Sequence, residues 1–278
     1  MSYQQYFAAM LSVVLVVSTE CVSADPLTQS ATNGREGLVA EPVPTVTSVP
    51  FAEVRVEGGL WAKRFAISRT VTIPVSFGQC EKTGRIDNFA VAAGLKEGSF
   101  QGAHYNDSDV YKIVQGAVYS LKAHPDPKLE EYLDGVIAKI AAAQQPNGYL
   151  DTFFMGGKKD SRFKHISPGP KHELYCMGHL IEAAVEHHRM TGKKTLLNVA
   201  IKLADHVDSI FGPGKRDIVP HHPQIESVLI ELFRETEEAR YFKLAQFFIE
   251  HRGHHENRES VTFYGQDHLP VRQQDEIV

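Results

Sequence analysis

Cysteine is scarce in this chain of 278 residues, which contains three. Cys21 lies close behind an N-terminal apolar run, so a chain that lost this region would keep Cys80 and Cys176 and could form one disulfide at most. Small secreted domains that depend on disulfides carry far more cysteine than this. The sequence therefore excludes a disulfide-stapled scaffold, and its 42% apolar residues suffice for an ordinary hydrophobic core.

Excess positive charge and long apolar runs are also missing. The formal net charge is −5, with 29 Lys and Arg against 34 Asp and Glu, and the basic residues are scattered rather than gathered in a stripe. Nucleic-acid binding depends on a basic surface, so it has no support here. The apolar run at residues 8–17 is too short to cross a bilayer, and no membrane span is predicted.

The same apolar run indicates an export signal. Residues 8–17 have the length of a signal-peptide core, and small residues stand at the −3 and −1 positions before Asp25. The basic residues that usually precede such a core are absent. We predict a signal peptide over residues 1–24, a flexible leader over residues 25–50, and a secreted or periplasmic protein.

Helical periodicity dominates the chain after about residue 105. Apolar residues recur there at helical spacing, and Pro and Gly mark the turns between the segments. Before this region, two short alternating runs at residues 53–56 and 70–74 predict a small extended lead-in. The predicted helices, which pair as hairpins, span residues 106–124, 127–146, 173–190, 194–210, 223–236 and 239–252.

The second helices of two of these hairpins, with the turns before them, resemble each other at an offset of 45 positions. Helix-pair repeats of this length build either an open α-solenoid or a closed ring of inner and outer helices, the α/α toroid. We predict an all-α fold, and periodicity alone leaves both arrangements open. The matching pairs are Thr191–Gly192 with Thr236–Glu237, Leu196–Leu197 with Tyr241–Phe242, and Ala200 with Ala245.

The segment that begins at His172 carries the most informative cluster of polar side chains. Within a helix His172, Cys176 and His179 lie at i, i+4 and i+7, so all three project from one face. An unpartnered buried imidazole costs about 1–3 kcal/mol, so we expect something polar opposite this face. The spacing also suits a metal-binding triad, but zinc normally needs a fourth ligand. We therefore interpret Cys176 as a small buried hydrophobe and predict no metal site.

Many short motifs occur together and in a fixed order along residues 51–278. With this set the chain resembles the N-terminal part of the catalytic domain of glycoside hydrolase family 127, the non-reducing-end β-L-arabinofuranosidases. The motifs are Trp61, Val71–Pro74, Thr83–Phe89, Ala92–Gly94, Asn106–Lys112, His124–Pro127, Ala143–Leu150, His172–Tyr175, Phe211–Pro213, His222–Glu226 and Pro270–Gln274.

The resemblance implies a partial (α/α)6 toroid over residues 51–278, belonging to an enzyme that hydrolyses terminal β-L-arabinofuranosyl groups of arabinose-containing glycans with retention of configuration. In that family a cysteine thiolate on zinc is the nucleophile and a Glu is the acid/base, and both lie in the second half of the barrel. The resemblance therefore places no catalytic residue before Val278, and zinc is expected only for the complete domain. It also implies that this chain is inactive alone.

The residues that carry over are His172 in His-Glu-Leu-Tyr and His222 in His-Pro-Gln-Ile-Glu, which match the family's sugar-contacting histidines. If both contact one pentose, their imidazoles must converge on one cavity. Asp107 and Asp109 could form the pair of carboxylates that glycosidases use, but their place at a helix start favours capping.

Two other functions stay open. The chain could be a non-catalytic or vestigial sugar-binding module. It could also be a helical scaffold that docks a protein partner, which would show a large exposed apolar patch. Without its neighbouring helices, the last hairpin is expected to expose its apolar flank.

Overall fold

The computed structural model describes residues 49–156, 161–164, 172–220, 222–254 and 270–271. The chain divides into two compact units, residues 1–48 and 49–278, and all described residues belong to the second. The predicted signal peptide and the leader up to residue 48 lie outside the described residues. None of the described helices is both long and apolar enough to cross a membrane.

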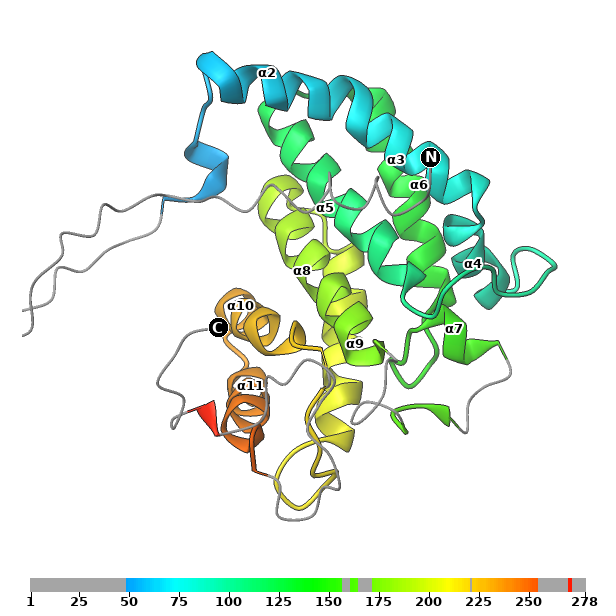
Figure 1. Cartoon of the computed structure of the whole chain (residues 1–278), viewed down its shortest axis with the longest axis vertical. Coiled ribbons are helices and arrows are strands. Elements are labelled where there is room, and N and C mark those ends of the chain that lie inside the picture. The colour runs from blue at the N-terminus through cyan, green and yellow to red at the C-terminus, as the bar shows by residue number, and fades with distance from the viewer. Residues whose placement is uncertain (1–48, 157–160, 165–171, 221, 255–269, 272–278) are drawn as a thin grey trace, which may run out of the picture. The chain divides into compact units, whose positions relative to one another are not determined.

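The described residues of the second unit are helices and their connections, and these ranges contain no strand (Figure 1). The all-α prediction is confirmed. The elements are η1 (Phe51–Glu53), α2 (Gly59–Ile67), the π-helical stretch η2 (Ser68–Thr72), α3 (Ile73–Lys82), α4 (Arg85–Ala92), α5 (Asn106–Ala123), α6 (Pro127–Ala143), α7 (Thr152–Met155), α8 (Glu173–Thr191), α9 (Thr195–Ile210), α10 (Ile225–Thr236) and α11 (Ala239–His251).

The six helices predicted after residue 105 are confirmed as α5, α6, α8, α9, α10 and α11, with small differences at their ends. The extended lead-in is wrong, because residues 70–74 continue a helical run from α2 through η2 into α3, and residues 54–56 form no strand. Pro74 lacks an N–H and would interrupt an ordinary α-helical ladder. The π-helical turn directly before it shifts the hydrogen-bond register, which lets the helix continue.

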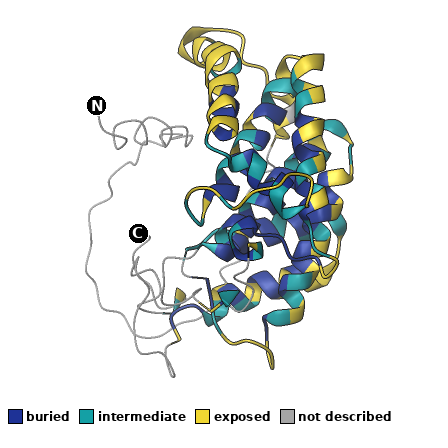
Figure 2. Ribbon diagram, turned by 90° about the vertical axis from the view of Figure 1, so that its right-hand side faces the viewer, coloured by how far each residue is buried: buried dark blue, intermediate teal, exposed yellow. Residues whose placement is uncertain are grey.

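Helix α8 is the centre of the packing. It contacts α5, α9 and α10, while α11 packs on α10 and α6 packs on α4 and α9. Leu180, Ile181 and Val185 of α8 are fully buried, and each such side chain stabilises the fold by about 1.5–3 kcal/mol. Figure 2 shows the buried residues concentrated where these helices face one another, whereas α2 contains no buried residue.

The two hairpins that match in sequence at an offset of 45 residues also match in structure at their turns. The hairpins α8–α9 and α10–α11 both end their first helix at a threonine whose hydroxyl donates to the carbonyl four residues earlier, at 2.6 Å for Thr191 and 2.7 Å for Thr236. The next residue is left-handed in both, with φ 74° at Gly192 and φ 60° at Glu237. The residues matched in sequence therefore occupy equivalent positions in the two turns.

We call the first helix of each hairpin, α8 or α10, the inner helix and the second, α9 or α11, the outer helix. The two hairpins differ in how well their outer helices are covered. Leu197 of α9 is 6% exposed, and the matching Phe242 of α11 is 46% exposed. Ile249, further along α11, is 40% exposed. The expected exposed apolar flank on the last hairpin is confirmed.

Candidate functional site

Two imidazoles from different hairpins meet at the start of α8. His172 is the N-cap residue of α8, and His222 lies in the segment that leads into α10. Their ring centroids are 5.3 Å apart, with an interplanar angle of 56°. Both side chains are half-buried. The rings are in contact, so a sugar cannot lie between them, and a shared ligand would touch both from one side.

The hydrogen bonds of these histidines restrict their tautomers. Nδ1 of His222 lies 2.9 Å from the carbonyl oxygen of Pro223, which can only accept. In neutral His222 the proton is therefore on Nδ1 and the lone pair on Nε2. Nδ1 of His172 lies 3.3 Å from Nε2 of His104, so one of these two nitrogens carries a proton and donates it to the other.

His104 and Tyr175 complete an aromatic cluster that sequence reasoning did not assign. Tyr175 packs its ring 4.3 Å from that of His222, 4.5 Å from that of His179 and 5.4 Å from that of His172, measured between centroids. Tyr175 could have been found, because it lies one turn after His172 in the quoted His-Glu-Leu-Tyr motif. His104 carried no signal, since it reaches the site from the loop before α5.

The predicted polar face of α8 does not form a metal site. Cys176 is buried, its thiol donates to the carbonyl oxygen of Tyr105 at 3.6 Å, and burial raises its pKa. Nδ1 of His179 lies 3.1 Å from Oε2 of Glu182, and burial lowers the pKa of His179. Across the described ranges, no three His, Cys, Asp or Glu side chains are arranged to hold a metal ion. These residues therefore do not fit the zinc centre implied for the complete domain.

Glu173, the first residue of α8, is a buried carboxyl group that ties two loops to the site. The Tyr149 hydroxyl donates to Oε1, and the Phe163 N–H donates to Oε2 at 2.7 Å. Burial raises the pKa of Glu173 to about 7, although these two hydrogen bonds act in the opposite direction. Both oxygens are engaged in holding the loops beside His172, which suits a structural role.

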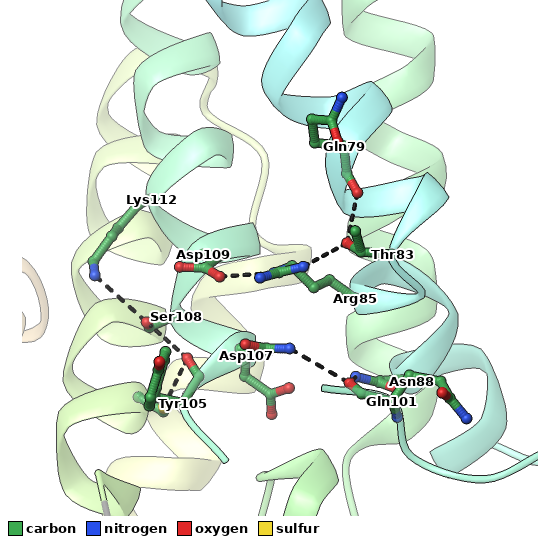
Figure 3. Close-up of polar contacts among 12 residues, drawn as sticks. Gln79, Thr83, Arg85, Asn88, Gln101, Tyr105, Asp107, Ser108, Asp109 and Lys112 are labelled. Atoms are coloured by element: carbon green, nitrogen blue, oxygen red, sulfur yellow. Dashed lines mark hydrogen bonds and ion pairs between the residues drawn. The ribbon is translucent and has the colours of Figure 1, made fainter. Parts of the chain in front are cut away.

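Asp107 and Asp109 neither cap α5 nor act together, so the capping prediction is wrong. The N-cap residue of α5 is Tyr105, which makes no side-chain cap. Asp107 accepts from the N–H and the hydroxyl of Thr152 at 2.7 and 2.5 Å, and burial raises its pKa to about 6. Asp109 pairs with Nε of Arg85 at 2.7 Å (Figure 3). Each carboxylate fastens α5 to a different element.

Comparison with known proteins agrees with the fold and the motifs. The family model of the β-L-arabinofuranosidase GH127 catalytic domain matches residues 53–278. This chain belongs to that family. A curated non-reducing end β-L-arabinofuranosidase of Bifidobacterium longum subsp. longum is 44% identical to this GH127 chain over 176 residues, which are 62% of this chain and 27% of that protein.

Two solved GH127 structures are also similar. The crystal structure of a GH127 β-L-arabinofuranosidase from Geobacillus stearothermophilus T6 has a TM-score of 0.74 and 33% identity, over 79% of this chain and 38% of that one. A GH127 β-arabinofuranosidase has a TM-score of 0.74 and 40% identity, over 82% of this chain and 37% of that one. The similarity supports helical hairpins of an (α/α)6-like toroid, as predicted. This GH127 chain spans well under half the length of these relatives.

Proposed function

We propose that this GH127 chain supplies part of the arabinofuranose-binding site of a β-L-arabinofuranosidase and does not hydrolyse glycosides alone. The contact between His172 and His222 carries the proposal, because it joins two motifs that resemble the family's sugar-contacting motifs. The relative from Bifidobacterium longum is a non-reducing end β-L-arabinofuranosidase, so we propose arabinose-containing glycans as the ligand class.

The chemistry of the site suits a sugar. A sugar hydroxyl both donates and accepts a hydrogen bond, and a neutral imidazole offers one donor and one acceptor. Aromatic rings such as Tyr175 and Tyr105 add apolar surface beside the half-buried imidazoles. A small ligand-binding site typically combines such apolar walls with a few oriented polar groups.

The carboxyl groups near the imidazoles do not support bond cleavage. A retaining glycosidase needs two carboxyl groups, or their equivalents, on either side of the scissile bond. Glu173 and Asp107 are buried, and each spends both oxygens on hydrogen bonds within the fold. We therefore assign neither group to catalysis and, following the family resemblance, place the acid/base, the nucleophile and the zinc outside this chain.

The experiment is a titration of the full chain with methyl β-L-arabinofuranoside, followed by NMR of ¹³C-labelled histidine side chains. The Cε1–Hε1 signals of His172 and His222 should shift saturably, while the exposed His254 should not respond. An aryl β-L-arabinofuranoside should release no arabinose with or without added zinc. Chelator-sensitive turnover, or an affinity that neither His172→Gln nor His222→Gln lowers, would contradict the proposal.

We also propose that the protein is exported, because the N-terminal sequence has the form of a signal peptide. N-terminal sequencing of the protein from the periplasm or medium of an expressing bacterium should begin near Asp25. An intact Met1 on the accumulated protein would contradict export by this route.

A further inference from the structure

Two tyrosines from different elements pack against the His172 imidazole. The ring centroid of Tyr105 lies 5.5 Å from that of His172, and the ring centroid of Tyr175 lies 5.4 Å from it. The interplanar angles are 64° and 78°, so both contacts are edge-to-face. Tyr175 also covers His222 at 4.3 Å, which makes it the one ring among these residues that contacts both histidines of the proposed site.

A short chain of hydrogen bonds along α5 connects these two tyrosines. Ser108 donates from Oγ to the carbonyl oxygen of Tyr105 at 2.9 Å, and Nζ of Lys112 lies 3.4 Å from Ser108 Oγ (Figure 3). The same Nζ donates to the Tyr175 hydroxyl at 2.5 Å. Ser108 and Lys112 are one helical turn apart, so a rigid element holds both donors in place.

Packing alone does not account for a tyrosine at position 175. The side chain is half-buried on α8, where Leu or Met would fill the space without a polar atom to satisfy. Its hydroxyl instead meets a lysine ammonium, and hydrogen bonds from charged donors are stronger than those between neutral groups. This hydrogen bond restrains the χ angles of the Tyr175 side chain. Through its contacts with both imidazoles, the Tyr175 ring in turn restrains their orientation.

We propose that Tyr175 and Lys112 are positioning residues that fix the orientation of the His172 and His222 imidazoles. Lys112 holds the Tyr175 ring, and the ring holds the histidines. The importance of this arrangement for sugar affinity rests on the proposed function. The orientation of the imidazoles can be measured without a sugar, so the two claims can fail separately.

The test uses the full chain with ¹³C-labelled histidine and four variants. Tyr175→Phe keeps the ring and removes the hydroxyl, Lys112→Met removes the donor, and Lys112→Arg restores a donor. Tyr119→Phe is the matched control, since Tyr119 is another half-buried tyrosine whose hydroxyl accepts from Gln115 at 3.4 Å, away from the imidazoles. Signals of His172 and His222 are assigned from His172→Gln and His222→Gln.

Tyr175→Phe and Lys112→Met should move the Cε1–Hε1 signals of His172 and His222, because the ring current at each imidazole depends on the angle of the tyrosine ring. Affinity for methyl β-L-arabinofuranoside should fall about tenfold in both variants. Lys112→Arg should restore the signals and most of the affinity, and Tyr119→Phe should change neither.

Imidazole signals that stay in place in both Tyr175→Phe and Lys112→Met would overturn the proposal. Lys112 is exposed, so Lys112→Met keeps the test decisive even if Tyr175→Phe fails to fold. If the wild-type chain binds no arabinofuranoside but the signals move as expected, the positioning role stands and the proposed function falls. If the affinity falls while the signals stay in place, Tyr175 and Lys112 do not act through the histidines.

Discussion

The hairpins α8–α9 and α10–α11 are alike at one end of their inner helices and different at the other. At the end of the inner helix both have a threonine that bonds back to the helix and a left-handed residue after it. At the start, α8 extends to Glu173 and has 19 residues, whereas α10 begins at Ile225 and has 12.

The shorter α10 leaves the segment before it free to cross α8. Gln224 donates from Nε2 to Glu182 at 2.9 Å, and an added Cβ on Gly178 would lie 2.7 Å from Gln224 Cγ. This crossing brings His222 to His172. The end of each inner helix, which we call the turn end, therefore follows the repeat. The start of the inner helices, which we call the site end, is where the two hairpins stop matching, and the candidate site lies there.

The largest expected effect concerns the outer helices. Leu197→Ala should lower the free energy of unfolding by about 2–5 kcal/mol, because Leu197 is buried in the hydrophobic core. Phe242→Ala should lower the free energy of unfolding by under about 1 kcal/mol, although the side chain is larger, because Phe242 is exposed. Urea unfolding measures both. Equal losses would show that the flank of α11 is covered in solution.

The next effect tests the crossing. Gly178→Ala places a methyl group against Gln224 Cγ and the backbone N of Ile225 at 3.1 Å. It should destabilise the fold by about 1–3 kcal/mol and weaken arabinofuranoside binding. The control is Gly135→Ala, an exposed helical glycine with no atom within 4 Å of its Cβ, which should stabilise the fold by up to about 1 kcal/mol. Unchanged affinity in Gly178→Ala would separate this segment from the site.

The region around the start of α8, where Asp107 and Glu173 are buried, and the turn end of α10 should respond to pH with opposite signs. Burial raises the pKa of Asp107 to about 6 and that of Glu173 to about 7, so the folded protein binds these protons more tightly than the unfolded chain. Their contribution is full below the unfolded pKa near 4 and is lost as pH rises to about 7. At the turn end burial acts to raise the pKa of Glu235, but Arg189 and His188 hold it below its usual value. That contribution is lost as pH falls through the acid range.

Urea midpoints between pH 3.5 and 8 measure both contributions. Asp107→Asn should flatten the decline toward pH 7, because an amide can keep both contacts to Thr152 without a charge. Glu235→Gln should flatten only the acid limb. Parallel curves for wild type and Asp107→Asn would show that Asp107 titrates normally.

The smallest effect compares the turns. Glu237 is a non-glycine residue with φ 60°, where the other hairpin has Gly192 with φ 74°. Glu237→Gly should stabilise the protein by up to about 1 kcal/mol, and Gly192→Ala should destabilise it by a similar amount. A stabilising Gly192→Ala would mean that this turn is not left-handed in solution.

Much of the fold was predictable because apolar spacing and turn residues act locally. The helices after residue 105 follow from that pattern. The errors have physical causes: the alternation at residues 70–74 resembled a strand, and Pro74 resembled a break, but the π-helical turn accommodates it. Asp107 resembled a cap, but its partner Thr152 lies far along the chain.

The candidate site was predictable in part. His172 and His222 came from motifs, and neither spacing nor periodicity could show that their rings touch. That contact depends on the length of α10 and on Gly178, which only the packing of α8 against the preceding segment reveals. His104 and Lys112 reach the site from α5 and the loop before it, and this contact also depends on the packing of helices that lie far apart in the sequence.

The central claim is that His172 and His222 form one ligand site, and a double-mutant cycle tests it most directly. Affinity for methyl β-L-arabinofuranoside is measured by NMR titration for wild type, His172→Gln, His222→Gln and the double variant, with His254→Gln as the control for an exposed histidine. Each single change should weaken binding about tenfold, and the double variant should bind little worse than either single one. Losses that add in full would show that the two imidazoles act independently of each other. A single change without effect would contradict the claim, because that histidine would not contact the ligand.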